Sequence, residues 1–144
     1  MKRIYIPGIP DVKMRPRATK KGHMYDPNAQ AKEASIQKAQ ITGDGRIYTG
    51  ALEVEYNFIF PRPKSHFRTG KMAGNLKEDA PPFCCNSKDF DNLAKFYSDS
   101  FNCIAYADDR QIVRSSQSKR WAIGEEQPHV EIVIKPLQTV DRSS

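Results

Sequence analysis

The segment 51–60 constrains the fold more than any other part of this sequence. In ALEVEYNFIF, the even-numbered positions from 52 to 60 carry large apolar side chains, whereas most of the odd-numbered ones are small or polar. Successive side chains of a β-strand point to opposite faces of a sheet, so this alternation is typical of a strand with one face in the core. We therefore predict a strand over 51–60.

Three further segments predict strands. Apolar residues alternate over 3–6, where Pro7 and Gly8 end the run, and again over 129–135. The segment 110–121 contains an Ile-Val pair followed by alternating residues, which also favours a strand. A sheet of several strands is expected.

Two helices are expected beside this sheet. Asp26 and Pro27 form a helix-start signal for a helix over about 27–40, which should lie on the surface of the sheet because Ile36 is its one large apolar residue. The segment 42–45 then predicts a turn. A second helix is predicted from Asp91, because apolar residues spaced four, four and three apart form one stripe: Leu93, Tyr97, Phe101 and Ile104.

These elements predict one small α/β (α+β) domain with a mixed β-sheet and two main helices. A chain of 144 residues suits a single domain. We assign residues 1–137 to this domain and expect the polar tail 138–144 to be frayed.

The charge is unevenly distributed. The chain has 23 Lys and Arg against 17 Asp and Glu, a net charge of +6, yet residues 78–109 hold seven acids and two bases. An acidic island in a basic chain suits a metal site that faces a polyanion. The alternative is an ordinary basic protein with a solvated acidic surface.

Two basic segments could contact nucleic acid. One is the segment 11–25, which lacks apolar periodicity and includes Lys13, Arg15 and Arg17. The other is the long segment 61–83, with four prolines and five basic residues, since loops of this length in small domains are usually functional or disordered. A solvated basic surface is the alternative for both.

The cysteines and the start of the chain point to a reduced, soluble protein. Cys84, Cys85 and Cys103 have neither Cys-x-x-Cys spacing nor a nearby histidine pair, so we expect free thiols rather than a zinc site or a disulfide framework. No segment is apolar enough for a signal peptide or a membrane span. A cytoplasmic protein without membrane association is expected.

The chemistry should concentrate in residues 88–119. Asp89 and Asp91 share a face if their segment is extended, Lys95 lies one helical turn after Asp91, and Asp109 precedes the predicted strand at 110–121. Such carboxylates can bind Mg²⁺ for attack on a phosphodiester, and a lysine can stabilise the developing charge. Taken singly, Asp91 could be only a helix cap, Lys95 only part of a surface ladder with Asp91 and Asp99, and Asp109 only a turn residue.

The order of these residues resembles the RusA family of Holliday-junction resolvases. The resemblance rests on D-F-D-N-L-x-K-x-x-x-D over 89–99, A-D-D-R-Q-I-V over 107–113 and Lys119. The early I-P-G-I-P with its following basic R-P-R, and the segment PRPKSHF, resemble phage and prophage members more loosely. The chain departs from the usual pattern at Ser87-Lys88, where relatives commonly place Lys-Pro, so the lysine is shifted by one residue.

The resemblance implies an endodeoxyribonuclease that nicks four-way DNA junctions and depends on Mg²⁺, with Mn²⁺ as a substitute. It implies Asp89, Asp91 and Asp109 as metal-binding catalytic acids and Lys95 as the catalytic lysine. Asp108 would contribute to the metal or hold Asp109 in place. It also implies a homodimer, which suits the approximate two-fold symmetry of a junction. The expected DNA-binding residues are Lys13, Arg15, Arg17, Lys88 and Lys119.

Two other functions remain open at this point. One is a catalytically weak protein that only binds branched DNA, and the other is a less selective nuclease that also cuts flaps or duplex. Binding without cleavage would indicate the first, and comparable cutting of linear duplex would indicate the second.

Overall fold

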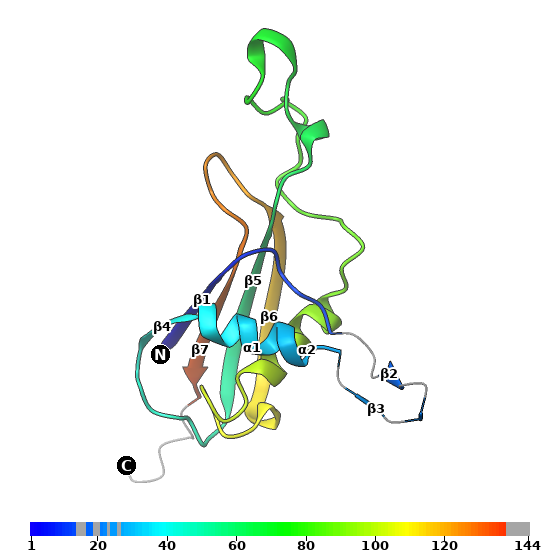
Figure 1. The fold of residues 1–144 in the computed structure, drawn as a ribbon. Coiled ribbons are helices and arrows are strands. Elements are labelled where there is room, and N and C mark those ends of the chain that lie inside the picture. The colour runs from blue at the N-terminus through cyan, green and yellow to red at the C-terminus, as the bar shows by residue number, and fades with distance from the viewer. Residues whose placement is uncertain (14–16, 19–20, 23, 26, 138–144) are drawn as a thin grey trace, which may run out of the picture.

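The computed structural model describes residues 1–13, 17–18, 21–22, 24–25 and 27–137. Within them, a five-stranded sheet has the order β4-β1-β7-β5-β6, and the two-residue strands β2 (Arg17–Ala18) and β3 (Met24–Tyr25) form a separate hairpin (Figure 1). The bounds of the sheet strands are β1 Lys2–Pro7, β4 Gln40–Gly43, β5 Leu52–Phe60, β6 Ile112–Trp121 and β7 His129–Pro136. β5 and β6 run parallel and the other neighbours antiparallel, which confirms the predicted mixed sheet and α+β class.

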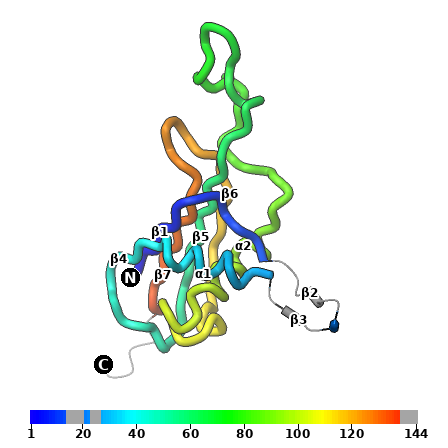
Figure 2. Tube along the Cα trace, viewed as in Figure 1, coloured from blue at the N-terminus to red at the C-terminus, as the bar shows by residue number. Residues whose placement is uncertain are grey.

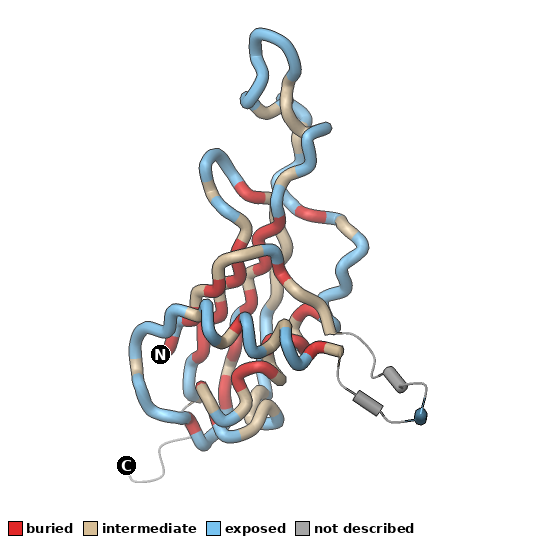
Figure 3. The backbone as a smooth tube through the Cα atoms, in the orientation of Figure 1, coloured by how far each residue is buried: buried red, intermediate tan, exposed pale blue. Residues whose placement is uncertain are grey.

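The strand predicted at 51–60 lies inside the sheet, between β7 and β6. Its alternate residues are almost completely buried, from Leu52 and Phe58 at 0% exposure to Tyr56 and Phe60 at 3%. Figure 3 shows this burial concentrated along the sheet strands and the helix segments packed on them. The period-two pattern therefore identified the core face correctly.

The second predicted helix is α2, Phe90–Ser100. Leu93, Tyr97 and Phe101 of the expected stripe are buried, and so is Phe96, which the stripe did not include. The prediction that the helix starts at Asp91 was wrong by one position, because Asp89 occupies the N-cap and its side chain accepts a hydrogen bond from the Asp91 N–H.

The first helix, α1, is shorter than predicted. It runs over Ala29–Lys38 with Asn28 at the N-cap position, and Asp26 of the expected start signal lies outside the described residues. It contacts α2 and β1, which agrees with a helix lying over the sheet (Figure 1).

The segment 40–43 pairs with the sheet, where we had predicted a turn over 42–45. β4 pairs with β1, so that Gln40 lies opposite Tyr5 and Gly43 opposite Lys2. Gly43 has a φ of +96°, and a Cβ at this position would collide with the Met1 carbonyl. Sheet pairing and this close approach, rather than a simple turn, explain the glycine.

Residues 61–83, which we call the arm, project beyond the end of β5 and return to β6 (Figure 2). The arm contains two short 3-10 helices, η1 (Lys64–His66) and η2 (Gly70–Met72).

Cys84, Cys85 and Cys103 are free thiols. None of the described helices is long and apolar enough to cross a membrane. The tail 138–144 lies outside the described residues, so its expected fraying stays a prediction.

Candidate active site

A pocket of about 380 Å³ lies between α2 and the beginning of β6. Three of the four predicted catalytic residues, Asp91, Lys95 and Asp109, line it. The remaining lining residues are Tyr56, Ala94, Ser98, Ile112 and Ser115. Asp91 and Asp109, which are 18 positions apart in the sequence, thus face one cavity, as the motif spacing predicted.

Helix α2 forms the wall of the pocket that contains Asp91. Asp91 and Lys95 are four residues apart, so both side chains lie on the same face of the helix. Lys95 forms no ion pair within the described part of the chain, and Asp99 pairs with Lys13 instead. The alternative of a surface ladder that joins Asp91, Lys95 and Asp99 is therefore not what the structure shows.

Asp89 lies just outside the pocket, at the start of α2. Its Oδ1 accepts a hydrogen bond from the Asp91 N–H at 2.7 Å, and its carbonyl accepts one from the Leu93 N–H at 3.0 Å. One carboxylate oxygen is thereby used to cap the helix. The structure gives the second oxygen, Oδ2, no hydrogen-bond partner among the described residues, so it can bind a ligand beside Asp91.

The turn before β6 sets the opposite side. Asp108 occupies the N-cap of the 3-10 helix η3 (Asp109–Gln111), where its side chain accepts a hydrogen bond from the Arg110 N–H at 2.9 Å. Gln111 completes the capping box and donates hydrogen bonds of 2.9 Å to the carbonyls of Tyr48 and Gly50. This network fixes the turn against the chain that leads into β5, and so fixes Asp109 in the pocket.

The electrostatics of Asp109 differ from those of its neighbours. Partial burial raises the pKa of Asp109, and hydrogen bonds and charge repulsion with Asp99 and Asp108 add to this. Burial also favours a higher pKa for Asp99. Hydrogen bonds and nearby positive charges, of which the hydrogen bond from Lys13 is the strongest, nevertheless hold the pKa of Asp99 below its usual value. Asp109 is thus a half-buried carboxyl group beside other carboxyl groups, an arrangement that a bound cation would stabilise.

The donor set fits a hard divalent cation. Mg²⁺ typically takes one or two protein carboxylates and fills its other positions with water and phosphate oxygens. Asp91 and Asp109 supply two carboxylates to one pocket, and Asp89 adjoins it. Over the residues that the structure describes, no three His, Cys, Asp or Glu side chains already form a closed metal-binding group.

The predicted DNA-binding residues lie in different environments. The Lys13 Nζ lies 2.7 Å from the Asp99 Oδ2, so this lysine joins the N-terminal segment to the site. Lys88 is exposed immediately before Asp89. Arg15 lies outside the described residues, and of Arg17 only the backbone, in β2, is described. DNA contact by these residues stays a prediction.

Lys119 has an internal role that its charge did not indicate. Its Nζ donates hydrogen bonds to the Lys88 carbonyl at 2.7 Å and to the carbonyl and side chain of Asn86 at 3.2 and 3.1 Å. It also lies 5.5 Å from the centre of the Phe90 ring. One lysine of β6 thus holds the segment that leads into Asp89, an arrangement that charge patterning could not reveal because the acceptors are mostly backbone carbonyls.

We expect Lys119→Met to loosen this segment. The substitution keeps an aliphatic side chain and removes the hydrogen bonds to residues 86 and 88, so the free energy of unfolding should fall by about 1–2 kcal/mol in thermal or denaturant unfolding. The dependence of DNA binding on salt should not change, because the ammonium already bonds to protein acceptors. A salt slope lower by about 0.9 would instead make Lys119 a phosphate contact.

Comparison with known proteins agrees with the motif and the geometry. The family model described as Endodeoxyribonuclease RusA matches residues 7–135. None of the curated proteins compared with the chain matches it. The matched range runs from the last residue of β1 to the penultimate residue of β7, and it includes α2 and every residue that lines the pocket. The chain therefore belongs to the RusA family of endodeoxyribonucleases, whose members resolve Holliday junctions.

Proposed function

We propose that this chain resolves four-way DNA junctions as a Mg²⁺-dependent homodimer that makes paired nicks. The observation that carries the proposal is the convergence of Asp91, Lys95 and Asp109 on one pocket. Family membership supports the junction as substrate. A net charge of +6 supports binding to a polyanion.

The residues divide the chemistry between them. Asp91 and Asp109 bind the metal, with Asp89 adding a carboxylate oxygen from the start of α2. When bound, Mg²⁺ polarises the scissile phosphate and activates a water for in-line attack, and Mn²⁺ can substitute. Lys95 donates hydrogen bonds to the phosphate oxygens, where negative charge grows in the transition state. Asp108 holds the turn that positions Asp109.

A homodimer follows from the symmetry of the substrate. A four-way junction has approximate two-fold symmetry, so a C₂ dimer can place one pocket on each of two equivalent strands. Binding through backbone phosphates would recognise the shape of the branch rather than its sequence.

The decisive assay compares three substrates of matched sequence: a synthetic four-way junction, a flap and a linear duplex. In Mg²⁺ we expect the junction to be nicked at paired positions, the other substrates to be cut far more slowly, and EDTA to stop cleavage. On a plasmid with an extruded cruciform, paired nicking should release linear product, because both strands are cut within one complex.

Other outcomes would replace the proposal. Comparable cutting of linear duplex would indicate a less selective nuclease. Tight junction binding without cleavage in either metal would indicate a branch-binding protein. Nicked circular plasmid that accumulates before linear product would argue against paired action by a dimer.

A further inference from the structure

The arm (residues 61–83) is a projection with an excess of basic residues. It carries five basic residues, Arg62, Lys64, Arg68, Lys71 and Lys77, against the acids Glu78 and Asp79. Every described residue of the arm is exposed or half-buried, and Figure 3 shows it extending beyond the buried sheet. Packing into the core therefore does not explain it.

The arm is nevertheless held together by hydrogen bonds. Its two legs pair through the Arg68 N–H and the Asn75 carbonyl at 2.8 Å, and through the Lys77 N–H and the His66 carbonyl at 2.9 Å. The 3-10 helix η2 lies between them at the tip. The projection is thus a defined structure that can present charges at fixed positions, unlike a solvated basic linker.

Its base is fixed to the end of the sheet. The Arg62 guanidinium donates hydrogen bonds to the carbonyls of Ala122 and Pro81 at 3.0 and 2.8 Å. The rings of His66 and Trp121 meet edge to face at 5.2 Å between centroids, and the Trp121 N–H donates to the Pro82 carbonyl at 3.1 Å. Both legs are thereby anchored to the end of β6.

The basic residues of the arm have two roles. Arg62 is used at the base, and Arg68 lies 3.7 Å from the Glu78 carboxylate. Lys64, Lys71 and Lys77 are exposed and form no ion pair within the described residues. Three unpaired ammonium groups on a fixed projection are complementary to a polyanion.

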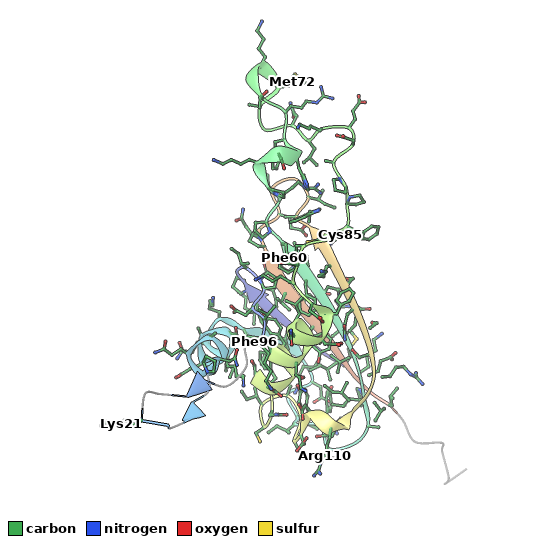
Figure 4. All side chains as sticks on the ribbon, turned by 90° about the vertical axis from the view of Figure 1, so that its right-hand side faces the viewer. Lys21, Phe60, Met72, Cys85, Phe96 and Arg110 are labelled. Atoms are coloured by element: carbon green, nitrogen blue, oxygen red, sulfur yellow. The ribbon has the colours of Figure 1, made fainter. Side chains whose placement is uncertain are left out.

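We infer that the arm binds the phosphate backbone of a junction limb at a distance from the cut. This inference rests on the proposed function. Both ends of this distance lie on β6, where Ser115 lines the pocket and Trp121 anchors the arm. They are six residues apart, and a strand rises by about 3.3 Å per residue, so about 20 Å separates them. At about 3.4 Å per base pair, the arm would reach DNA about six or more base pairs from the cut phosphate. Figure 4 shows Met72 of the arm and Arg110, next to Asp109, at opposite ends of the molecule.

The test is a triple variant, Lys64→Gln, Lys71→Gln and Lys77→Gln. Each lost phosphate contact lowers the log–log slope of binding against salt by about 0.9, so the slope for junction DNA should fall by up to about 2.7. The hydroxyl-radical footprint should lose its protection about six or more base pairs from the nick. The cleavage rate at saturating enzyme should stay within about two-fold, because the variant leaves the pocket unchanged.

A matched control removes the same charge from the body of the domain, with the substitutions Lys38→Gln, Arg46→Gln and Lys135→Gln. An equal fall in slope with this control, or an unchanged slope and footprint in the arm variant, would overturn the inference. A change of oligomeric mass in sedimentation, with an unchanged slope, would overturn it in favour of a second copy of the chain as partner. Failure of the wild-type chain to cut a junction would instead overturn the proposed function.

Discussion

Replacing Asp109 or Asp89 by asparagine is expected to abolish junction cleavage while junction binding persists. Asparagine has nearly the same shape but no negative charge, so it binds Mg²⁺ far less well than a carboxylate. The single-turnover rate in Mg²⁺ should fall by about 10²–10⁴-fold. Binding, measured on an uncleavable junction or with Ca²⁺, should be unchanged or tighter, because a negative charge near the DNA has been removed.

The substitution at Asp89 is informative because this residue also caps α2. Its Oδ1 accepts the hydrogen bond of the Asp91 N–H. Asparagine caps helices about as well as aspartate, so thermal unfolding should be nearly unchanged. A large loss of cleavage at unchanged stability would therefore report the charge of Asp89. An unchanged nicking rate would show that Asp89 is only a cap and that the pocket functions through Asp91 and Asp109.

Asp108→Asn is the matched control for Asp109→Asn. Asp108 is the neighbouring acid, but it caps η3 through a hydrogen bond from the Arg110 N–H, which asparagine can also accept. We expect a rate within about ten-fold of wild type. Equal loss in both variants would mean that Asp108 is itself a metal ligand.

The sequence predicted the core because the core depends on local periodicity, and it predicted the catalytic cluster because the residues follow the order of the RusA motif. β5 and α2 were recognised from spacings of two and of three to four residues, and the convergence of Asp91 with Asp109 from the order of motif residues. Phe96 was missed because it lies beside the predicted stripe and makes the buried face of α2 wider than that stripe. β4 was missed because its four residues are all exposed and its place depends on pairing with β1.

Contacts between distant residues could not be predicted in this way. Lys13 and Asp99 are 86 positions apart, and no pattern in either segment indicates their 2.7 Å contact. The defined structure of the arm depends on backbone hydrogen bonds and on guanidinium contacts with carbonyls. Such contacts leave no signal in the amino-acid composition. For the same reason, Lys119 was assigned to DNA from its position in the family pattern, which gave no indication that its ammonium holds the segment before Asp89.

Replacing Lys95 by methionine should slow cleavage by about 10²–10³-fold at saturating enzyme, the effect of removing one preorganised donor to transition-state charge. Lys95 is exposed on α2 and lines the pocket with Asp91 and Asp109. It forms no ion pair among the described residues that would give it a structural role. Methionine keeps the length and the helix propensity, so folding should be preserved. The measurement is the single-turnover rate, with the dissociation constant determined separately on an uncleavable junction.

Lys88→Met is the control, because Lys88 is an exposed lysine immediately before Asp89 that does not line the pocket. If Lys88 contacts phosphate, its loss should weaken binding and lower the salt slope by about 0.9 without changing the saturated rate. Lys95→Arg should recover part of the lost rate, because it restores the charge but not the compact ammonium. If Lys95→Met changed only the dissociation constant and its salt slope, Lys95 would be a DNA contact like the one expected of Lys88. The stabilisation of the transition state would then depend on the metal and its carboxylates alone.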